Sequence, residues 1–303
     1  MQPARPLAAA LAGETLVLDG GLSNQLAAQG CDLSDALWSA RLLAEGPEEI
    51  AAAHAAYVRA GAQVLITSSY QATYEGFARR GTDRAAAAEL LARSVGLARR
   101  AAAGVEREVW VAASVGPYGA MLADGSEYRG RYGLSVAELE RFHRPRIETL
   151  AAAAPDVLAL ETVPDEDEAR ALLAAAEGCG VPVWLSYSVE ADGERTRAGQ
   201  PLTEAFALAA GNDQVVAVGV NCCEPAAVDR ATEIAAKVTG KPVVVYPNSG
   251  EQWDAAARTW RGDATFDPSW VSAWRAAGAR LIGGCCRVGP EAIARLRPGR
   301  LRL

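Results

Sequence analysis

The stretch Val157–Val189, VLALETVPDEDEARALLAAAEGCGVPVWLSYSV, carries the pattern that decides the fold. Its first part, 157–164, is an almost continuous apolar run, and 165–178 has Ala and Leu at helical spacing. A second apolar run, 181–189, follows. Runs of this kind are typical of parallel strands that are buried on both faces. The stretch therefore predicts a strand, a helix and a second, parallel strand.

The same alternation runs through the rest of the chain. It predicts strands at 15–21, 63–69, 109–117, 157–164, 181–189, 215–223, 242–250 and 280–286. It predicts helices at 47–61, 82–104, 135–154, 165–178, 202–211, 224–240, 268–278 and 290–297. Strands that alternate with helices in this number predict an α/β protein with a closed (β/α)8 TIM-type barrel. No linker divides the chain, so we expect residues 1–303 to form a single domain.

A doubly wound open sheet is the alternative architecture. Such sheets carry an early glycine-rich phosphate loop, whereas Asp19-Gly20-Gly21 does not have the G-x-G-x-x-G pattern. The N-terminal segment 1–21 weakly resembles a secretory signal, but it runs directly into a strand, and we expect a short capping helix there. Pro145 lies inside a predicted helix and predicts a kink or a break at that point.

Composition and charge exclude several classes of partner. The net charge is −7 and no block of basic residues occurs, which argues against nucleic acid. No apolar run approaches the ~18 residues that span a bilayer, so we expect no membrane partner and a cytoplasmic location. Because the cytosol is reducing, the six cysteines indicate metal binding or catalysis before disulfides. The sequence leaves the oligomeric state open.

Polar residues gather where the predicted strands end, which is where a (β/α)8 barrel places its active site. They are Asp19, Ser68, Ser69, Glu161, Asn221, Cys222, Cys223, Asn248, Cys285 and Cys286. We expect them to converge on one mouth of the barrel. The long connection 116–133, rich in Gly and Tyr, follows the third strand and has the length of a functional loop.

Strands six and eight each end in a cysteine pair, Cys222-Cys223 and Cys285-Cys286. Three thiolates and an open position make a catalytic zinc site. Residues 283–284 are glycines, which let the backbone bend so that two adjacent thiols face one ion. Neighbours in a regular strand diverge, so one of Cys222 and Cys223 should point away. Buried free thiols, or a disulfide between the pairs, are the alternatives.

The remaining thiols and the imidazoles fit structural roles better. We expect Cys31 and Cys179 to be buried free thiols. His54 and His143 lie in predicted helices, where packing or a structural polar contact is expected. Neither belongs to an HExxH pair, and no G-x-S-x-G nucleophile motif is present, so a serine triad is unsupported.

A carboxylate and a run of backbone amides at the mouth suggest an amino-acid subsite. Glu161 ends an apolar strand and can bind a substrate ammonium; a salt bridge to a neighbouring strand is its alternative role. Asp19 is similar, and Gly20 and Gly21 beside it offer N–H groups to a carboxylate.

Several long motifs resemble the homocysteine S-methyltransferases, and most closely their S-methylmethionine-dependent branch. They are Asn221-Cys222, SYQATYEGFARRG (69–81), SVGPYGAMLADGSEYRGRY (114–132), FHRPR (142–146), VVYPNSGEQWD (244–254) and AGARLIGGCCR (278–287). The likeness runs from about residue 14 to 296. The chain departs from the family at 21–25, Gly-Leu-Ser-Asn-Gln, which affects the detail of the amino-acid subsite.

The resemblance implies that Cys222, Cys285 and Cys286 bind Zn²⁺ and that Cys223 does not. It implies that Glu161 lies near the amino group of the substrate. Further substrate-binding residues are expected at the other strand ends: Asp19, Gly20, Ser68, Ser69, Asn221 and Asn248.

The implied reaction moves a methyl group from a sulfonium to the thiol of L-homocysteine and forms methionine. S-methylmethionine is preferred as donor through the resemblance alone, and S-adenosylmethionine, betaine or a folate remain alternatives. Selenocysteine is an alternative acceptor, and a non-catalytic zinc or redox thiol protein is an alternative function. Tyr118, Tyr128 and Tyr132 in the long connection are candidates to bind a sulfonium through cation–π contact.

Overall fold

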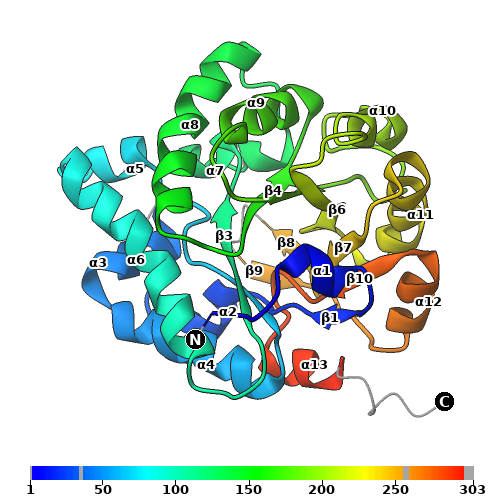
Figure 1. Ribbon diagram of the computed structural model, residues 1–303, viewed down its shortest axis with the longest axis horizontal. Coiled ribbons are helices and arrows are strands. Elements are labelled where there is room, and N and C mark those ends of the chain that lie inside the picture. Colours follow the sequence, from blue (N-terminus) through cyan, green and yellow to red (C-terminus); the bar gives the residue numbers. More distant parts are fainter. Residues whose placement is uncertain (1, 34–36, 255–258, 297–303) are drawn as a thin grey trace.

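A computed structural model describes residues 2–33, 37–254 and 259–296 of the chain. Its parallel strands form a closed barrel with helices outside it, which confirms the predicted architecture (Figure 1). The strands are β1 Leu16–Val17, β2 Val64–Ile66, β3 Trp110–Val115, β4 Val157–Val163, β5 Val183–Tyr187, β6 Val215–Asn221, β7 Val243–Tyr246 and β10 Ala279–Ile282. They follow one another around the sheet in chain order, and a parallel bridge between Leu18 and Val64 closes it.

Alternation along each strand divides the core into two parts. One set of side chains fills the barrel interior, and it includes Leu16, Trp110, Trp184 and Leu281. The other set packs between the strands and the surrounding helices. Because both faces of every strand are covered, the strands read as continuous apolar runs, and that is why the sequence predicts them well.

The helices of the outer layer begin and end at residues with clear signals. Their bounds are α4 Pro47–Ala60, α6 Arg84–Ala102, α8 Val136–Ala152, α9 Glu166–Ala176, α10 Leu202–Ala207, α11 Val228–Thr239, α12 Trp270–Ala277 and α13 Pro290–Arg295. Asp83, Ser135 and Asp165 cap the amino ends of α6, α8 and α9 through their side chains. Gly61 ends α4 with a φ of 111°.

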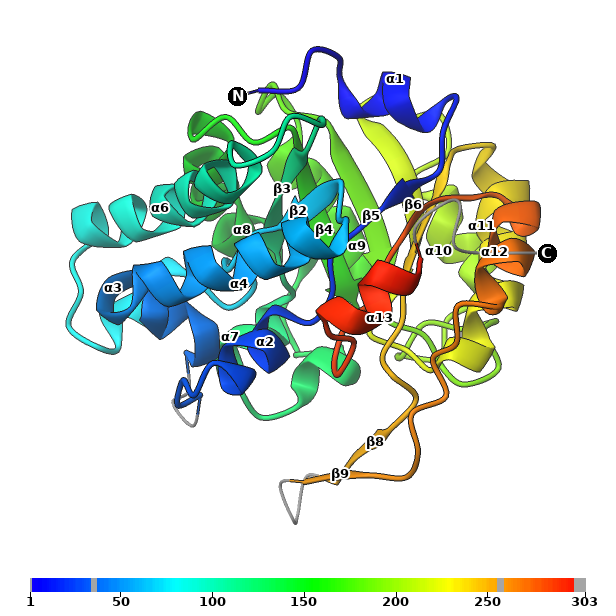
Figure 2. The same ribbon diagram turned by 90° about the horizontal axis from the view of Figure 1, so that it is seen from below.

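The N-terminal segment closes the barrel at the end opposite the mouth. Helix α1, Leu7–Leu11, buries Leu7, Ala10 and Leu11 against the interior cluster (Figure 2). The Trp110 indole donates a hydrogen bond to the Arg5 carbonyl at 3.0 Å. This confirms the expected capping helix. Of the two alternatives at Pro145, the break is wrong, because α8 continues through it as one helix.

Short elements that the sequence did not predict cluster at the mouth. They are α2 Leu22–Ala28, a 3-10 turn at Trp38–Arg41, α3 Leu42–Glu45, α5 Tyr74–Ala78, α7 Tyr118–Leu122, and a 3-10 turn at Ser126–Tyr128. A further 3-10 turn, Pro225–Ala227, lies within the helix predicted at 224–240 and leads into α11. An antiparallel hairpin, β8 Gln252–Asp254 and β9 Thr259–Arg261, projects from the body (Figure 2). Elements of three to seven residues are too short for a periodic pattern to reveal.

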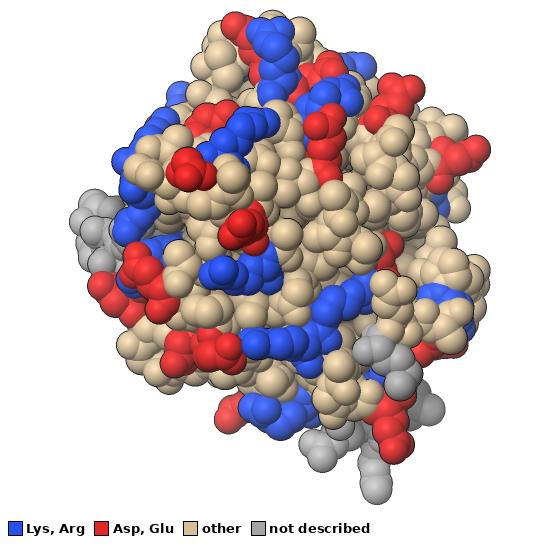
Figure 3. All heavy atoms as spheres, turned by 60° about the vertical axis from the view of Figure 1, so that its left-hand side comes forward, with Lys and Arg blue, Asp and Glu red and all other residues tan. Residues whose placement is uncertain are grey.

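The surface agrees with the absence of a basic arm in the sequence. On the face drawn in Figure 3, acidic and basic side chains are interspersed. None of the helices in the described ranges is both long and apolar enough to cross a bilayer. That residues 1–303 form one domain stays a prediction, since its ends lie outside the described residues.

Candidate functional site

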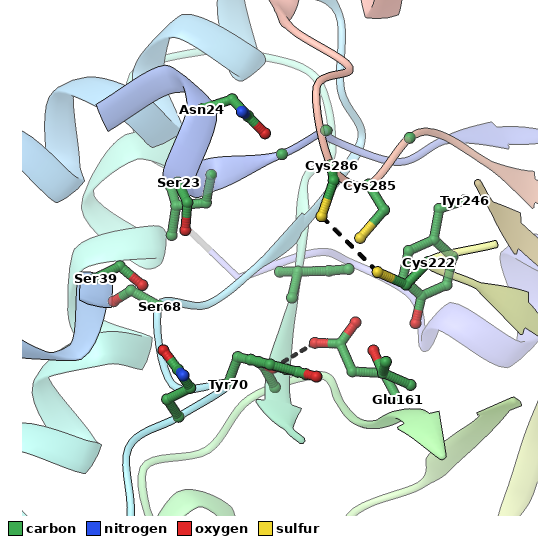
Figure 4. Close-up of a pocket in the computed structure, with 18 of the residues that line it drawn as sticks. Ser23, Asn24, Ser39, Ser68, Tyr70, Glu161, Cys222, Tyr246, Cys285 and Cys286 are labelled. Atoms are coloured by element: carbon green, nitrogen blue, oxygen red, sulfur yellow. Dashed lines mark hydrogen bonds between the residues drawn. The ribbon is translucent and has the colours of Figure 1, made fainter. Parts of the chain in front are cut away.

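A cavity of about 130 Å³ opens at the C-terminal ends of the strands (Figure 4). A single water needs roughly 10–15 Å³, so the cavity has room for a molecule of about the size of an amino acid. Its lining comprises Gly20, Gly21, Leu22, Ser23, Asn24, Ser39, Ile66, Thr67, Ser68, Tyr70, Gln71, Ser114, Tyr128, Glu161, Thr162, Cys222, Tyr246, Gly284, Cys285 and Cys286. Residues at strand ends that are far apart in the sequence therefore line the same cavity.

Three thiols meet on one side of the cavity. The sulfur atoms of Cys222, Cys285 and Cys286 all lie within 4.8 Å of one another, and those of Cys222 and Cys286 are 3.8 Å apart (Figure 4). These three residues are the pattern of soft ligands that suits a thiolate-bound metal. The structure thus brings together strands β6 and β10 as the sequence predicted.

The backbone at Cys222 decides which thiol of the first pair faces the cavity. Cys222 has a φ of 50°, in the left-handed region, which interrupts the alternation of β6. As a result Cys222 joins the cavity wall, whereas Cys223 packs into the outer hydrophobic layer. Burial raises the pKa of the Cys223 thiol to about 12, so it stays protonated. One member of the pair points away, as predicted.

The two glycines before Cys285 allow close packing. A Cβ on Gly283 would lie 2.5 Å from the Asp19 carbonyl oxygen, and one on Gly284 would lie 2.2 Å from Val288. Neither glycine has a positive φ, and the left-handed residue of this loop is Arg287, with a φ of 66°. The structure therefore gives the glycines a packing reason: Gly283 lets the loop approach the end of β1, and Gly284 leaves room for Val288. That they also let the backbone bend stays a prediction.

Two asparagines of the predicted set support the thiols from behind the cavity wall. The Asn248 side-chain oxygen accepts a hydrogen bond from the Cys286 N–H at 3.1 Å. The Asn221 oxygen accepts from the Thr162 N–H at 2.8 Å and from the Ser186 hydroxyl at 2.7 Å. Both amides use these atoms to hold neighbouring strand ends together, and neither lines the cavity.

Glu161 faces the cavity from the side opposite the thiols (Figure 4). Its side chain is buried, and the Ser114 hydroxyl donates a hydrogen bond to it. Burial raises the pKa of Glu161 to about 7, against the hydrogen bonds from Ser114 and Tyr246. Among the described residues, the groups that shift its pKa are Ser114, Tyr246 and Cys222, and none of them is a cation. A buried carboxylate without a cationic neighbour is suited to bind a cationic group of a ligand.

The remaining predicted residues divide between the cavity and its support. Gly20 and Ser68 line the cavity, and the Ser68 hydroxyl has no hydrogen-bond partner in the part of the chain that the structure describes. The Asp19 carboxylate lies behind the wall, where it accepts from the Ile66 N–H at 2.9 Å. Burial raises the pKa of Asp19 well above its usual value. Ser69 also lies behind the wall and donates to the Ser114 carbonyl at 2.8 Å.

Of the three tyrosines in the long connection, only Tyr128 reaches the cavity. Its hydroxyl lies 3.1 Å from the sulfur of Cys222. Tyr118 and Tyr132 instead pack together, with ring centroids 5.2 Å apart, and Tyr118 also packs on Phe142 at 4.9 Å. Of these three candidates, the structure therefore places only the Tyr128 ring beside the thiols, in a cavity that Tyr70 and Tyr246 also line.

A buried polar network anchors this connection. Glu168 accepts hydrogen bonds from the Tyr118 N–H at 2.5 Å, the Tyr132 hydroxyl at 2.9 Å and His143 Nε2 at 2.9 Å. Arg146 donates to His143 Nδ1 at 2.7 Å. Because a guanidinium has no acceptor, His143 must be protonated on Nε2 and donate to Glu168. His143 thus makes the structural polar contact that the sequence suggested.

Sequence reasoning did not identify much of the cavity lining. Thr162 and Tyr246 lie at strand ends, next to Glu161 and within the predicted seventh strand, and could have been found there. Ser23, Asn24 and Ser39 come from the short elements over the mouth, which carry no strand signal. Their place in the cavity depends on how those elements fold over the barrel.

Comparison with known proteins gives consistent matches over nearly the whole chain. The family model described as homocysteine S-methyltransferase matches residues 16–298. A homocysteine S-methyltransferase of Escherichia coli is 46% identical over 294 residues, which cover 94% of each chain. Homocysteine S-methyltransferase 4 of Zea mays is 47% identical over 302 residues, covering 93% of this chain and 88% of the relative.

Solved structures agree with these matches. The metallated form of the homocysteine methyltransferase MmuM from Escherichia coli superposes with a TM-score of 0.87 at 45% identity. The alignment covers 96% of this chain and 99% of that protein. Its oxidised form superposes with a TM-score of 0.86.

Proposed function

The chain belongs to the homocysteine S-methyltransferase family, and from this premise we propose that it is a zinc-dependent enzyme that methylates homocysteine from a sulfonium donor. The product is methionine. The observation that carries the proposal is the group of three thiols that faces the buried carboxylate of Glu161 across one cavity. A metal site and an ammonium site within one small cavity are what an amino-acid thiol needs.

The donor set fits a metal of the zinc type. Hydrogen bonds from Cys285 and Cys286 lower the pKa of Cys222, while the pKa values of Cys285 and Cys286 are raised, first by their hydrogen bonds with Cys222. Three thiols this close cannot all ionise unless a cation compensates them. Cys222, Cys285 and Cys286 would hold Zn²⁺ and leave one position open. When bound, zinc lowers the pKa of a coordinated substrate thiol, so that a thiolate is available at neutral pH.

The protein residues would bind and orient the two substrates. Glu161 receives the ammonium of homocysteine, and the amide of Gly20 receives its carboxylate. The Gly21 N–H is not available for this role, because it donates to the Val288 carbonyl at 3.0 Å. The Tyr128 ring, whose hydroxyl lies 3.1 Å from the Cys222 sulfur, would lie beside the sulfonium. A sulfonium leaves as a neutral thioether, so no general acid is needed, and alignment of sulfur, methyl and thiolate contributes several kcal/mol.

S-methylmethionine is the proposed donor. The experiment that tests the function is metal analysis of the purified protein, followed by assays with homocysteine and S-methylmethionine, S-adenosylmethionine, betaine or a methyl folate. We expect about one zinc per chain and methionine from a sulfonium donor only. Metal-free protein with an oxidised cysteine pair and no methyl transfer would instead support the redox alternative. A cytoplasmic location also stays a prediction.

Replacing Glu161 with Gln is expected to raise the KM for homocysteine at least about 10-fold, because an uncharged amide binds an ammonium less strongly. Zinc content should stay at the wild-type level, since Glu161 is not among the three thiols. Measurement of both quantities on the same preparation checks the assignment. Unchanged homocysteine affinity would remove Glu161 from the ammonium site.

The pH dependence provides a second test of this residue. Burial raises the pKa of Glu161 to about 7, and only its ionised form attracts an ammonium. Homocysteine binding by the wild type should therefore weaken as the pH falls from 8 through about 7. The Glu161→Gln variant should lack this change in homocysteine affinity near pH 7. It should keep any pH dependence that arises from the thiols. Superimposable profiles for the two proteins would contradict the prediction.

A further inference from the structure

Arg197 lies at the mouth with no carboxylate partner among the described residues. Its side chain is half-buried, in the loop between β5 and α10. The guanidinium makes a single long hydrogen bond, from Nε to the Ser188 hydroxyl at 3.3 Å. Its carbon atom lies 5.7 Å from the ring centroid of Tyr128. A partly desolvated guanidinium with free N–H groups is well suited to bind an anion, and a carboxylate in particular.

The loop that carries Arg197 is tied down on three sides. The Arg197 backbone N–H donates to the Ser188 carbonyl at 3.1 Å. The next backbone N–H, that of Ala198, donates to the Pro164 carbonyl at 3.1 Å. The Ala198 carbonyl accepts from Arg131 in the long connection at 2.7 Å. Arg197 is therefore held at the end of β4 and beside the connection that contains Tyr128, and its position is built into the fold.

Tyr128 separates Arg197 from the thiols. Its hydroxyl is 3.1 Å from the sulfur of Cys222, whereas the guanidinium stands by its ring. The sulfonium and carboxylate of an S-methylated methionine are about 5 Å apart along the carbon chain, similar to the span of this ring. Arg197 does not line the cavity proposed for homocysteine.

We infer that Arg197 binds the carboxylate of an amino-acid methyl donor, with the sulfonium on the Tyr128 side near Cys222. The inference rests on the proposed function and makes that donor site specific for sulfonium compounds that carry a carboxylate. The acceptor, homocysteine, is bound on the cavity side of Tyr128 by other groups. Loss of the Arg197 charge should therefore affect the donor and spare the acceptor.

The test compares Arg197→Met and Arg197→Lys with a control, Arg195→Met. Arg195 is exposed, belongs to the same loop and donates to the Gly199 carbonyl at 3.1 Å. The Met change should raise the KM for S-methylmethionine about 10- to 100-fold, since it removes a charge-assisted hydrogen-bonded pair. Lys, a point charge without the fork, should give an intermediate value. In the Arg197 variants, the KM for homocysteine and the zinc content should stay within about twofold of the wild-type values. All of these quantities should stay within the same range in Arg195→Met.

A donor without the negative charge identifies the group that Arg197 binds. The wild type should use the carboxamide of S-methylmethionine with a kcat/KM about 10- to 100-fold below that of the acid, and Arg197→Met should lose this preference. An unchanged donor KM, a raised homocysteine KM, or equal losses with acid and amide would each overturn the inference. If none of the sulfonium donors allows the wild type to methylate homocysteine, the proposed function is wrong as well. If the wild type is active and only the Arg197 effects are missing, the function stands.

Discussion

Replacement of Cys222, Cys285 or Cys286 with Ser is expected to abolish stable zinc binding and to lower methyl transfer by more than about 100-fold. Loss of a residue that only supports a ligand already costs about 10- to 100-fold, so loss of the ligand itself should exceed that range. A Ser hydroxyl has almost the shape of a thiol but does not ionise at neutral pH, so the variants test the ligand rather than the packing. Metal content and initial rate, measured on each variant, check the prediction.

Cys223→Ser is the matched control for these variants. Cys223 is adjacent to Cys222 in the chain but packs in the outer hydrophobic layer. The variant should bind about one zinc and keep most of its activity, although burial of a hydroxyl without a partner costs about 1–3 kcal/mol of stability. A folded Cys223→Ser protein without zinc would show that Cys223, and not Cys222, completes the metal site.

Glu168→Gln is expected to destabilise the protein by about 3–5 kcal/mol, the usual cost of removing one charge of a buried ionic network. His143 connects Glu168 to Arg146, and all three side chains are buried. Burial raises the pKa of Glu168 to about 7, so unfolding by denaturant should be measured near pH 8, where the carboxylate is ionised. The same change should lower kcat/KM for the donor, because Glu168 anchors the connection that carries Tyr128.

Glu140→Gln is the control for this prediction, because it removes an acid that is paired with an arginine of α8 near the surface. Its partner is Arg144, and the two side chains are about one-third exposed, at 32% and 38%. A pair of this kind contributes at most about 1 kcal/mol. Similar costs for Glu140→Gln and Glu168→Gln would mean that the buried network is no more important to the fold than an ion pair at the surface.

The barrel could be predicted because burial on both faces gives each strand an apolar run. The elements that shape the mouth could not, since a segment such as Leu22–Ala28 or the β8–β9 hairpin is too short to show a period. For the same reason the sequence predicted that strand ends carry the site, but it did not indicate that Ser23 and Ser39 reach the cavity.

Among the candidate site residues, those whose role depends on chemistry alone were easier to predict than those whose role depends on direction. Cys285 and Glu161 could be predicted because a reactive side chain at a strand end is a candidate for the site, and both line the cavity. Asn221 and Asn248 look equally suitable in the sequence, yet their side chains bond to neighbouring strand ends. Tyr118, Tyr128 and Tyr132 were equivalent candidates, and only packing distinguishes them.

The sequence by itself determined the order of the elements and the presence of thiols, a carboxylate and aromatic rings at the ends of the strands. Apolar periodicity and residue chemistry are local properties, and they can be read from a linear chain. The family resemblance already implied that Cys222, and not Cys223, is a ligand, but only the tertiary structure gives the physical reason, which is one positive φ that reverses the alternation of β6. The tertiary structure also decided that Arg197 stands beside Tyr128, since that contact joins two loops whose approach is set by the packed barrel.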